Sequence, residues 1–283
     1  MSIKLLIAVM LVSSVVQAQR ISVKKGQVLL DKKAAVLVST KKNVYTISSL
    51  EGQSMFSAEA KFLELENGVQ KGWFVITDLE THQQNQVPHI LSVMAISRER
   101  RMMEELVKGA SKLITENGVD KNILQSTTQG VPIDFQAVYK VVNDSIVREF
   151  EYADQLLVKN KIRITAIGEI LRPLAFDRNS PDGDQPREEF LGTVYFESGG
   201  TLIKKKYTIT NSKNRVIACW CDFGIIYVPG VDGQNLINEV LMNNGQKYKV
   251  KEIPEDSFKA ITMDKSQMAR RLLALVFANG VFE

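Results

Sequence analysis

Residues 43–79 read "NVYTISSLEGQSMFSAEAKFLELENGVQKGWFVITDL" and give the chain its fold class. Short runs of β-favouring residues alternate with turn residues, and from Val44 to Ser49 successive side chains would point to opposite faces of a strand. Glu51-Gly52 and Asn67-Gly68 stand where hairpin turns need the positive φ that glycine adopts. We therefore predict an antiparallel β-meander that extends from Arg20 to about Leu79.

The pattern changes after this meander. Apolar residues recur at helical spacing and predict a helix over 97–117, with Ser97 as N-cap and Asn117-Gly118 as its end. The repeating residues are Met103, Leu106, Val107, Ala110, Leu113 and Ile114. We expect a strand over 89–96 before this helix and an irregular linker over 125–132 after it.

The second half of the chain begins with an ambiguous segment, residues 133–158. Its stripe Val138, Val142, Ile146, Phe150, Ala153 and Leu157 fits a helix, while "IVREFEY" also fits a strand. The β pattern returns from Gln155 to Val228. Two helices are predicted to close the chain, one over about 234–243 and one over 264–278, the latter with Asp264 as N-cap and Asn279-Gly280 as its end.

These elements predict an α+β protein made of antiparallel β-meander modules, each followed by helices. The first module covers 19–130 with helix 97–117, and the second covers 131–283 with its C-terminal helices. An internal duplication is one reading of two similarities: residues 27–38 with 155–166, and residues 43–52 with 193–202. Chance likeness between amphipathic strands is the other.

The N-terminus has the three parts of a secretory signal peptide. Lys4 is followed by an apolar stretch from Leu5 to Val16, and Val16-Gln17-Ala18 places small residues at a cleavage point. We expect cleavage after Ala18, a mature chain from Gln19, and a periplasmic or secreted location. No later stretch reaches the length of a transmembrane helix, so no membrane anchor is expected in the mature chain.

The charge balance is mild. The formal net charge is +4 at pH 7, and loss of Lys4 with the signal peptide lowers it by one. The basic clusters at 98–101 and 204–206 are short, and such runs are usually solvated. We therefore expect no nucleic-acid partner.

The segment "YTISSLEG" (residues 45–52), together with the signal peptide and the strand-turn-strand opening, resembles uncharacterised secreted β-rich proteins of Bacteroidetes-type bacteria. The resemblance covers about the first hundred residues. It implies a location in the bacterial envelope, and it supplies no catalytic residue because those proteins carry no established activity.

The two cysteines, Cys219 and Cys221, lie in "VIACWCDFGIIYV" (residues 216–228). As a strand, this segment would place Ile217, Cys219, Cys221, Phe223 and Ile225 on one apolar face. Buried unpaired thiols are the favoured reading. A strained bridge between neighbours on one face, a metal site and a catalytic thiol remain alternatives. No histidine or basic neighbour in the sequence favours the catalytic thiol.

Three further groups of side chains are candidates for a functional site. His82 and His89 flank a polar segment and would serve as a base only in a site assembled from distant residues. Asp177, Asn179, Asp182 and Asp184 offer oxygen ligands for calcium in the 177–189 loop, which a solvated loop explains equally well. Trp73, Phe74, Trp220, Phe223 and Tyr227 are candidates to line a ligand groove, although aromatic residues in strands mostly form core.

No nucleophile–base set, cofactor loop or metal cluster stands out, so we assign no catalytic, cofactor-binding or metal residue and expect no cofactor. We predict an exported envelope protein that acts as a non-catalytic binding or assembly module. Its partner would be another envelope protein or a small ligand. The alternative is a secreted hydrolase with a site assembled from distant residues.

Overall fold

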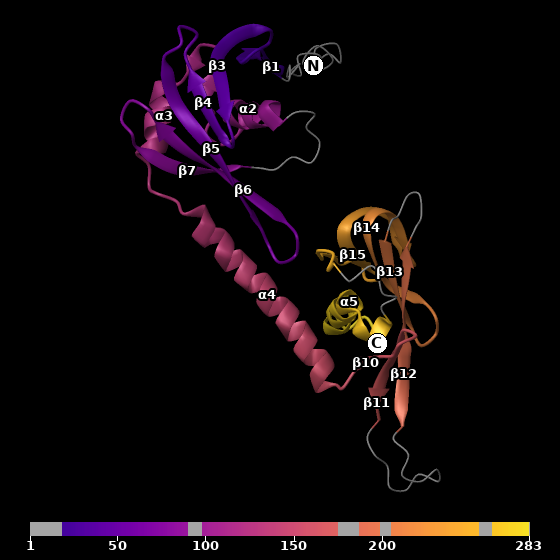
Figure 1. The fold of residues 1–283 in the computed structure, drawn as a ribbon. Coiled ribbons are helices and arrows are strands. Elements are labelled where there is room, and N and C mark those ends of the chain that lie inside the picture. Colours follow the sequence, from indigo (N-terminus) through magenta and orange to yellow (C-terminus); the bar gives the residue numbers. More distant parts are fainter. Residues whose placement is uncertain (1–18, 90–97, 175–186, 199–204, 255–261, 283) are drawn as a thin grey trace, which may run out of the picture. The chain divides into compact units, whose positions relative to one another are not determined.

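The computed structural model describes residues 19–89, 98–174, 187–198, 205–254 and 262–282 (Figure 1). These residues are mostly β, in antiparallel sheets. The chain divides into two compact units: unit 1 comprises Met1–Leu63 and Lys71–Phe135, and unit 2 comprises Glu64–Gln70 and Gln136–Glu283. The predicted signal peptide and nearly all of the predicted strand over 89–96 lie outside the described residues.

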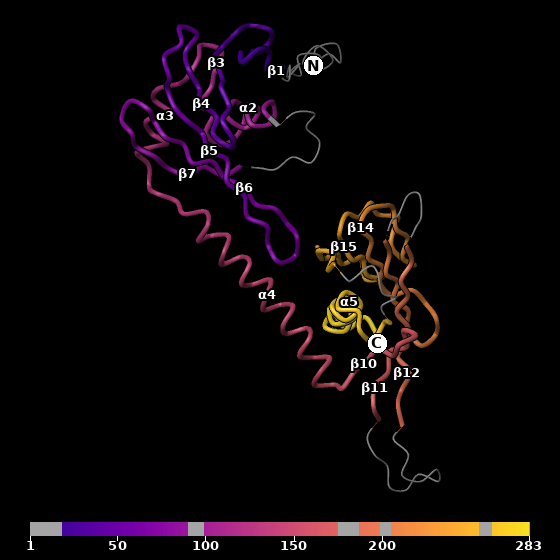
Figure 2. The backbone as a smooth tube through the Cα atoms, viewed as in Figure 1, coloured from indigo at the N-terminus to yellow at the C-terminus, as the bar shows by residue number. Residues whose placement is uncertain are grey.

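The sheet of unit 1 has seven strands, each hydrogen-bonded to the next in chain order. Figure 2 traces the backbone through this meander. The strands are β1 (Ile21–Lys24), β2 (Gln27–Leu30), β3 (Lys33–Lys41), β4 (Val44–Ser48), β5 (Ser54–Glu64), β6 (Gln70–Asp78) and β7 (Gln84–His89). Gly52 and Gly68 have φ of +91° and +83° in their turns, as predicted. Tyr45 and Ile47 alternate into the core, because successive side chains of a strand face opposite ways.

Helix α2 (Arg98–Lys108) covers one face of this sheet with Met102, Met103, Leu106 and Val107. The predicted helix over 97–117 is therefore too long. Lys112 has φ +46°, and Asn117-Gly118 turns the short hairpin of β8 (Ile114–Thr115) and β9 (Gly118–Val119). Leu113 and Ile114 are buried as the pattern required, but an Asn-Gly pair favours a hairpin turn more than a helix end.

The predicted linker over 125–132 is half right: residues 129–132 are irregular, but residues 125–128 belong to the helix α3 (Lys121–Thr128). Asp120 caps it, with its Oδ1 accepting from the main-chain N–H groups of Asn122 and Ile123 at 3.0 Å each. The Thr128 hydroxyl donates to the Leu124 carbonyl oxygen. Local side-chain bonds thus make a helix of residues that usually favour turns.

The ambiguous segment is a helix, α4 (Phe135–Lys159), and all of it but Phe135 belongs to unit 2. A second sheet follows, again with seven strands in chain order. Its strands are β10 (Arg163–Ile164), β11 (Glu169–Pro173), β12 (Glu188–Ser198), β13 (Lys205–Asn211), β14 (Val216–Val228), β15 (Val231–Met242) and β16 (Lys247–Lys249). Residues 234–243, predicted as a helix, lie almost entirely in β15. Pairing with β14 over most of its length determines this, because tertiary pairing overrides weak local propensity.

The core of unit 2 lies between this sheet and α5 (Gln267–Ala278). The buried face of α5 includes Met268, Leu272, Leu273, Leu275 and Val276. Each such side chain contributes roughly 1.5–3 kcal/mol by burial. The predicted end at Asn279-Gly280 is confirmed, whereas the cap is Ser266 rather than Asp264, which lies in the 3-10 turn Met263–Lys265.

The structure contradicts one of the two sequence similarities that suggested a duplication and agrees with the other. Residues 27–38 form most of the β2–β3 hairpin, but residues 155–159 of their proposed counterpart belong to α4. That pairing joins a hairpin to a helix and is wrong. Residues 44–48 and 193–198 both lie in strands, as two amphipathic strands of any origin would.

Candidate functional site

The cysteine strand, β14, lies inside the second sheet between β13 and β15. Cys219 and Cys221 are both buried and unbonded to each other, which confirms the prediction of unpaired thiols. Both belong to a small hydrophobic cluster that is separate from the main core of unit 2. The cluster consists of Cys219, Cys221, Ile226, Val228, Leu236 and Leu241.

The chemistry of the two thiols follows from this burial. Burial raises the pKa of Cys221 to about 12, with further contributions from Cys219 and Asp222, and burial also raises the pKa of Cys219. The Sγ atom of Cys221 lies 3.9 Å from the Gly224 carbonyl oxygen. A thiol with so high a pKa carries almost no thiolate at neutral pH, so neither cysteine is suited to nucleophilic chemistry.

The side chains of β14 do not alternate regularly between the two faces of the sheet along the whole strand. The prediction that Ile217, Cys219, Cys221, Phe223 and Ile225 share one apolar face is therefore wrong. Ile217 belongs to the main core next to Trp220, after a register irregularity against β13. Beyond Cys221 the pattern reverses, because Ile226 and Val228 join the cysteine cluster while Phe223 and Ile225 are exposed. Gly224 (φ +148°) and Asn238 (φ +50°) lie at this reversal, where such backbone conformations re-aim the strand.

The reversal creates an exposed apolar surface on the end of the β14–β15 hairpin, which we call the ribbon face. Phe223, Ile225 and Tyr227 are 58%, 58% and 75% exposed, and alternation places all three on one side. Ile237 of β15 pairs directly with Phe223 and is also exposed. Three large apolar side chains in a row on one strand, with a fourth beside them on the next strand, are unusual on a solvated face, since such residues are mostly buried.

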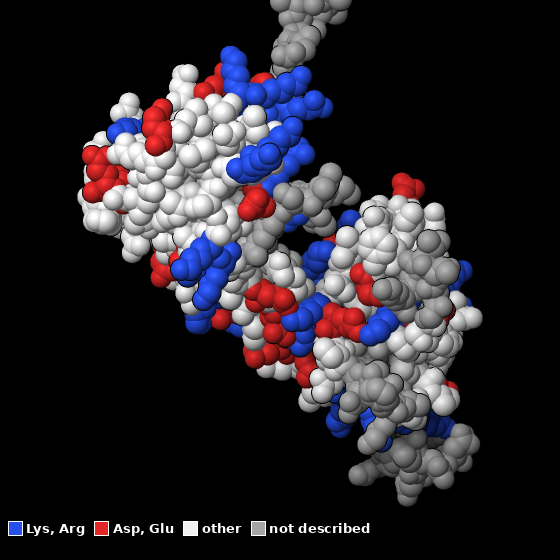
Figure 3. All heavy atoms as spheres, turned by 45° about the horizontal axis from the view of Figure 1, so that its top comes forward, with Lys and Arg blue, Asp and Glu red and all other residues white. Residues whose placement is uncertain are grey.

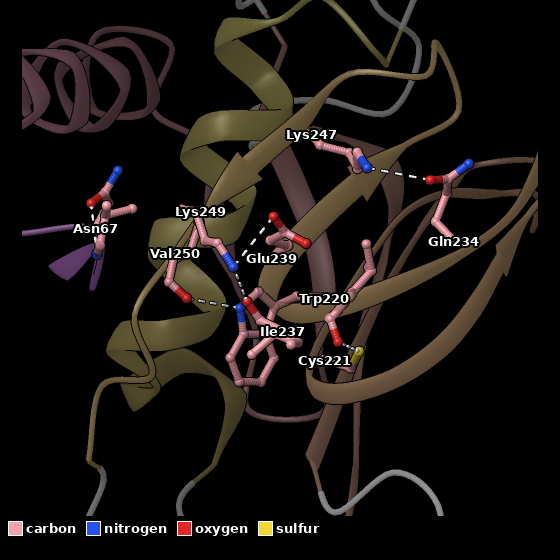
Figure 4. Close-up of polar contacts among 11 residues, drawn as sticks. Asn67, Trp220, Cys221, Gln234, Ile237, Glu239, Lys247, Lys249 and Val250 are labelled. Carbon is pink, nitrogen blue, oxygen red and sulfur yellow. Dashed lines mark hydrogen bonds and ion pairs between the residues drawn. The ribbon is translucent and has the colours of Figure 1, made fainter. Parts of the chain in front are cut away.

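The hairpin that carries the ribbon face is held by specific contacts. Pro229-Gly230 forms the turn, with Gly230 at φ +86°, and Tyr227 covers Gly233 so closely that an added Cβ there would lie 2.4 Å from its Cε1. At the base, Lys249 Nζ donates to the Ile237 carbonyl oxygen at 2.6 Å and pairs with Glu239 (Figure 4). These contacts make the ribbon face an ordered surface.

The aromatic residues predicted to line a groove do not form one set. Trp73 and Phe74 are buried in unit 1, and Trp220 is buried in the core of unit 2. Phe223 and Tyr227 alone are exposed, on the ribbon face. The sequence signal for this face was the alternation Phe223, Ile225, Tyr227 next to Asp222, and it was read as core.

The two histidines lie in different settings within unit 1. His82 is exposed in the β6–β7 turn with φ +61°. His89 ends β7, 4% exposed, with its ring against Phe74 at a centroid distance of 4.8 Å and against Phe62 at 5.9 Å. Gly72 pairs with His89 across the sheet and leaves room for the ring.

The surroundings of His89 keep it neutral. Burial, and secondarily the charge of Arg101, lowers its pKa to about 4. Its Nδ1 lies 3.9 Å from Glu105 Oε2, and neither ring nitrogen has a hydrogen-bond partner among the described residues. A neutral, enclosed imidazole of this kind is a packing residue, and the cysteines lie in the other unit.

A groove of about 670 Å³ runs between α4 and α5 in unit 2. Arg270 donates to both carboxylate oxygens of Asp154, at 2.6 and 3.0 Å, and the Arg271 guanidinium lies 4.8 Å from the centre of the Phe150 ring. Both arginines on its wall therefore already have partners. A ligand would have to replace these contacts, which makes the groove a weaker candidate than the ribbon face.

Metal binding has little support in the described ranges. They contain no group of three or more His, Cys, Asp or Glu side chains placed to hold a metal ion. Most of the 177–189 loop, with Asp177, Asn179, Asp182 and Asp184, lies outside the described residues, so the calcium hypothesis stays a prediction.

The chain matches no protein-family model, and neither a curated protein nor a solved structure is significantly similar to it. Among the helices of the described residues, none combines the length and the apolar character that a membrane crossing requires.

Proposed function

We propose that this protein is an exported, non-catalytic binding module of the bacterial envelope, which recognises a protein partner through the ribbon face. The single observation that carries the proposal is the row Phe223, Ile225 and Tyr227, exposed together on an ordered hairpin. Aromatic and large apolar residues are the ones that dominate binding energy at protein interfaces.

The shape of the surface favours a protein over a small ligand. Small ligands bind in concave sites that enclose most of their surface. The ribbon face is one side of a two-stranded hairpin, and Asn235, which pairs with Ile225, is its polar neighbour on β15. In this view the two β-rich modules and their helices are a scaffold that presents the face, whether or not they arose by duplication.

A photo-crosslinking amino acid at Tyr227 tests the proposal in cells. We expect one adduct of discrete mass, lost when Phe223→Ser is added. Tyr152 on α4, 60% exposed, is the matched control position, and it should give no such adduct. Equal labelling at both positions, or adduct formation that ignores Phe223→Ser, would overturn the proposal.

The hydrolase alternative has its own test. The purified protein is screened against peptide, glycan and ester substrates, and we expect no turnover. Hydrolysis that disappears in His82→Ala or His89→Ala would show the non-catalytic assignment to be wrong. A parallel measurement of thermal stability is needed for His89→Ala, because the buried ring also supports the fold.

A further inference from the structure

Lysine pairs occupy three successive hairpin turns of unit 1. They are Lys24-Lys25, Lys32-Lys33 and Lys41-Lys42, and between Arg20 and Leu50 the one acidic residue is Asp31. The surrounding chain is close to neutral, so this positive charge is concentrated in β1 to β4. Figure 3 shows basic side chains gathered along one side of unit 1.

Topology divides these pairs between the two ends of the sheet. In a meander, the β1–β2 and β3–β4 turns lie at the same end, and the β2–β3 turn lies at the opposite end. Val38 N donates to the Gly26 carbonyl oxygen at 2.7 Å, so the end of β3 continues past the β1–β2 turn. Lys24, Lys25, Lys41 and Lys42 therefore share one end, which we call the lysine end.

The charges at the lysine end are unmatched. All four side chains are exposed, and none forms an ion pair with a described residue. Other lysines of the chain do form such pairs, for example Lys61 with Glu59 and Lys140 with Asp144. Uncompensated cations at one end of a sheet repel one another, and an anionic partner would remove this cost.

Turn geometry does not explain these residues. Lys25 and Lys42 have φ of +48° and +57°, a region in which glycine and asparagine are at ease and lysine is not. Lys32, at the opposite end of the sheet, has φ +75° as well. A function of the lysine end therefore has to rest on its charge and not on the backbone of its turns.

We propose that the lysine end docks unit 1 on an anionic lipid surface. Lysine ammonium groups are hydrated point charges on flexible stems, which suit the diffuse charge of lipid headgroups. Arginine forks suit a single, discrete phosphate better. The β1–β2 and β3–β4 turns expose their lysines to solvent at the same end of the sheet. Each lysine close to such a surface strengthens binding roughly 5-fold.

Vesicle sedimentation tests this proposal with a matched pair of variants. The protein begins at Gln19, because the apolar residues 5–16 would themselves enter lipid. Lys41→Gln/Lys42→Asn removes two charges from the lysine end, and Lys32→Asn/Lys33→Gln removes two from the other end of β3. Each variant loses one strand lysine and one lysine at positive φ (Lys42 at +57°, Lys32 at +75°), so the backbone changes are alike.

We expect the protein to sediment with vesicles of phosphatidylcholine and phosphatidylglycerol in equal parts, but not with phosphatidylcholine alone. Lys41→Gln/Lys42→Asn should weaken binding about 25-fold. The control should weaken it only a few-fold, and salt near 1 M should abolish it, because the Debye length is then about 3 Å.

Equal losses in the two variants, or no binding to anionic vesicles, would overturn the proposal. So would retention on a soluble polyanion such as heparin without vesicle binding. Crosslinking at Tyr227 does not involve these lysines, so the two proposals fail separately.

Discussion

The indole Nε1 of Trp220 donates a 2.9 Å hydrogen bond to the main-chain carbonyl oxygen of Val250 (Figure 4). Both residues are buried in the core of unit 2. This bond ties the segment after β16 to the middle of β14, and it satisfies a carbonyl group that water does not reach. A buried acceptor without its donor costs about 1–3 kcal/mol.

Trp220→Phe should therefore lower the free energy of unfolding of unit 2 by about 2–4 kcal/mol, from the lost bond and the smaller ring together. Urea unfolding followed by circular dichroism measures this. Tyr227→Phe is a useful control, because it alters an exposed aromatic residue. A loss below about 0.5 kcal/mol for Trp220→Phe would show that this bond does not matter.

The buried His89 should make unit 1 sensitive to acid. The pKa of His89 is about 4 in the folded protein and about 6.5 when unfolded. The unfolded chain therefore takes up a proton first. The stability is complete above about pH 6.5 and is lost as the pH falls to about 4, by roughly 3 kcal/mol in all.

Unfolding measured at a series of pH values tests this expectation. His89→Leu should flatten the dependence between pH 6.5 and 4, whereas the exposed His82→Gln should leave it unchanged. If the slope survives in His89→Leu, other groups cause it.

The two thiols should not react with alkylating reagents in the native state. Cys219 and Cys221 are buried, and the pKa of Cys221 is about 12. We expect maleimide to label neither cysteine in native protein at neutral pH and both in denaturant, as read from intact mass. Rapid native labelling of either thiol would contradict the cluster described here.

Two neighbouring isoleucines in β14 test whether the buried and exposed faces of this strand change sides after Cys221. Ile226 is buried in the cysteine cluster, whereas Ile225 is 58% exposed. Ile226→Ser should cost about 3–4 kcal/mol of stability, and Ile225→Ser should cost less than about 1 kcal/mol. The opposite order would restore the regular strand that the sequence suggested.

The start of α5 offers a comparison of two caps. Ser266 Oγ accepts from Ala269 N at 3.0 Å, so Ser266→Ala should cost about 1 kcal/mol. Asp264→Ala should be nearly neutral, because Asp264 lies in the preceding 3-10 turn. Thermal unfolding of the two variants separates these outcomes.

The sequence predicted what depends on local pattern and failed where distant pairing decides. The hairpin turns at Gly52 and Gly68, and the end of α5 at Asn279, were read correctly because a few residues determine them. Residues 234–243 were misread because their conformation is set by β14, which is paired with them residue by residue.

The ribbon face was missed for a related reason. Alternation predicts which side chains share a face only while the backbone stays regular. Asn238 at φ +50° breaks that regularity from the neighbouring strand, and Gly224 at φ +148° breaks it within β14. Gly224 is the signal that the sequence offers, because a glycine inside a strand pattern often marks a bulge or bend. The apolar residues of β14 otherwise look alike in the sequence, although Cys221 is core and Phe223 is surface.

The placement of the two tryptophans has a practical consequence. Trp73 lies in unit 1 and Trp220 in unit 2, and the sequence contains no other tryptophan. Each unit therefore has a single tryptophan, which can be excited selectively over the tyrosines. With Trp73→Phe or Trp220→Phe, the emission of the intact chain reports one unit at a time. Trp220→Phe itself lowers the stability of unit 2, so the emission of each variant is compared with the circular dichroism of the same variant. Signals that change together would mean that the units melt as one, and an emission change separate from the main transition would give that unit its own melting temperature.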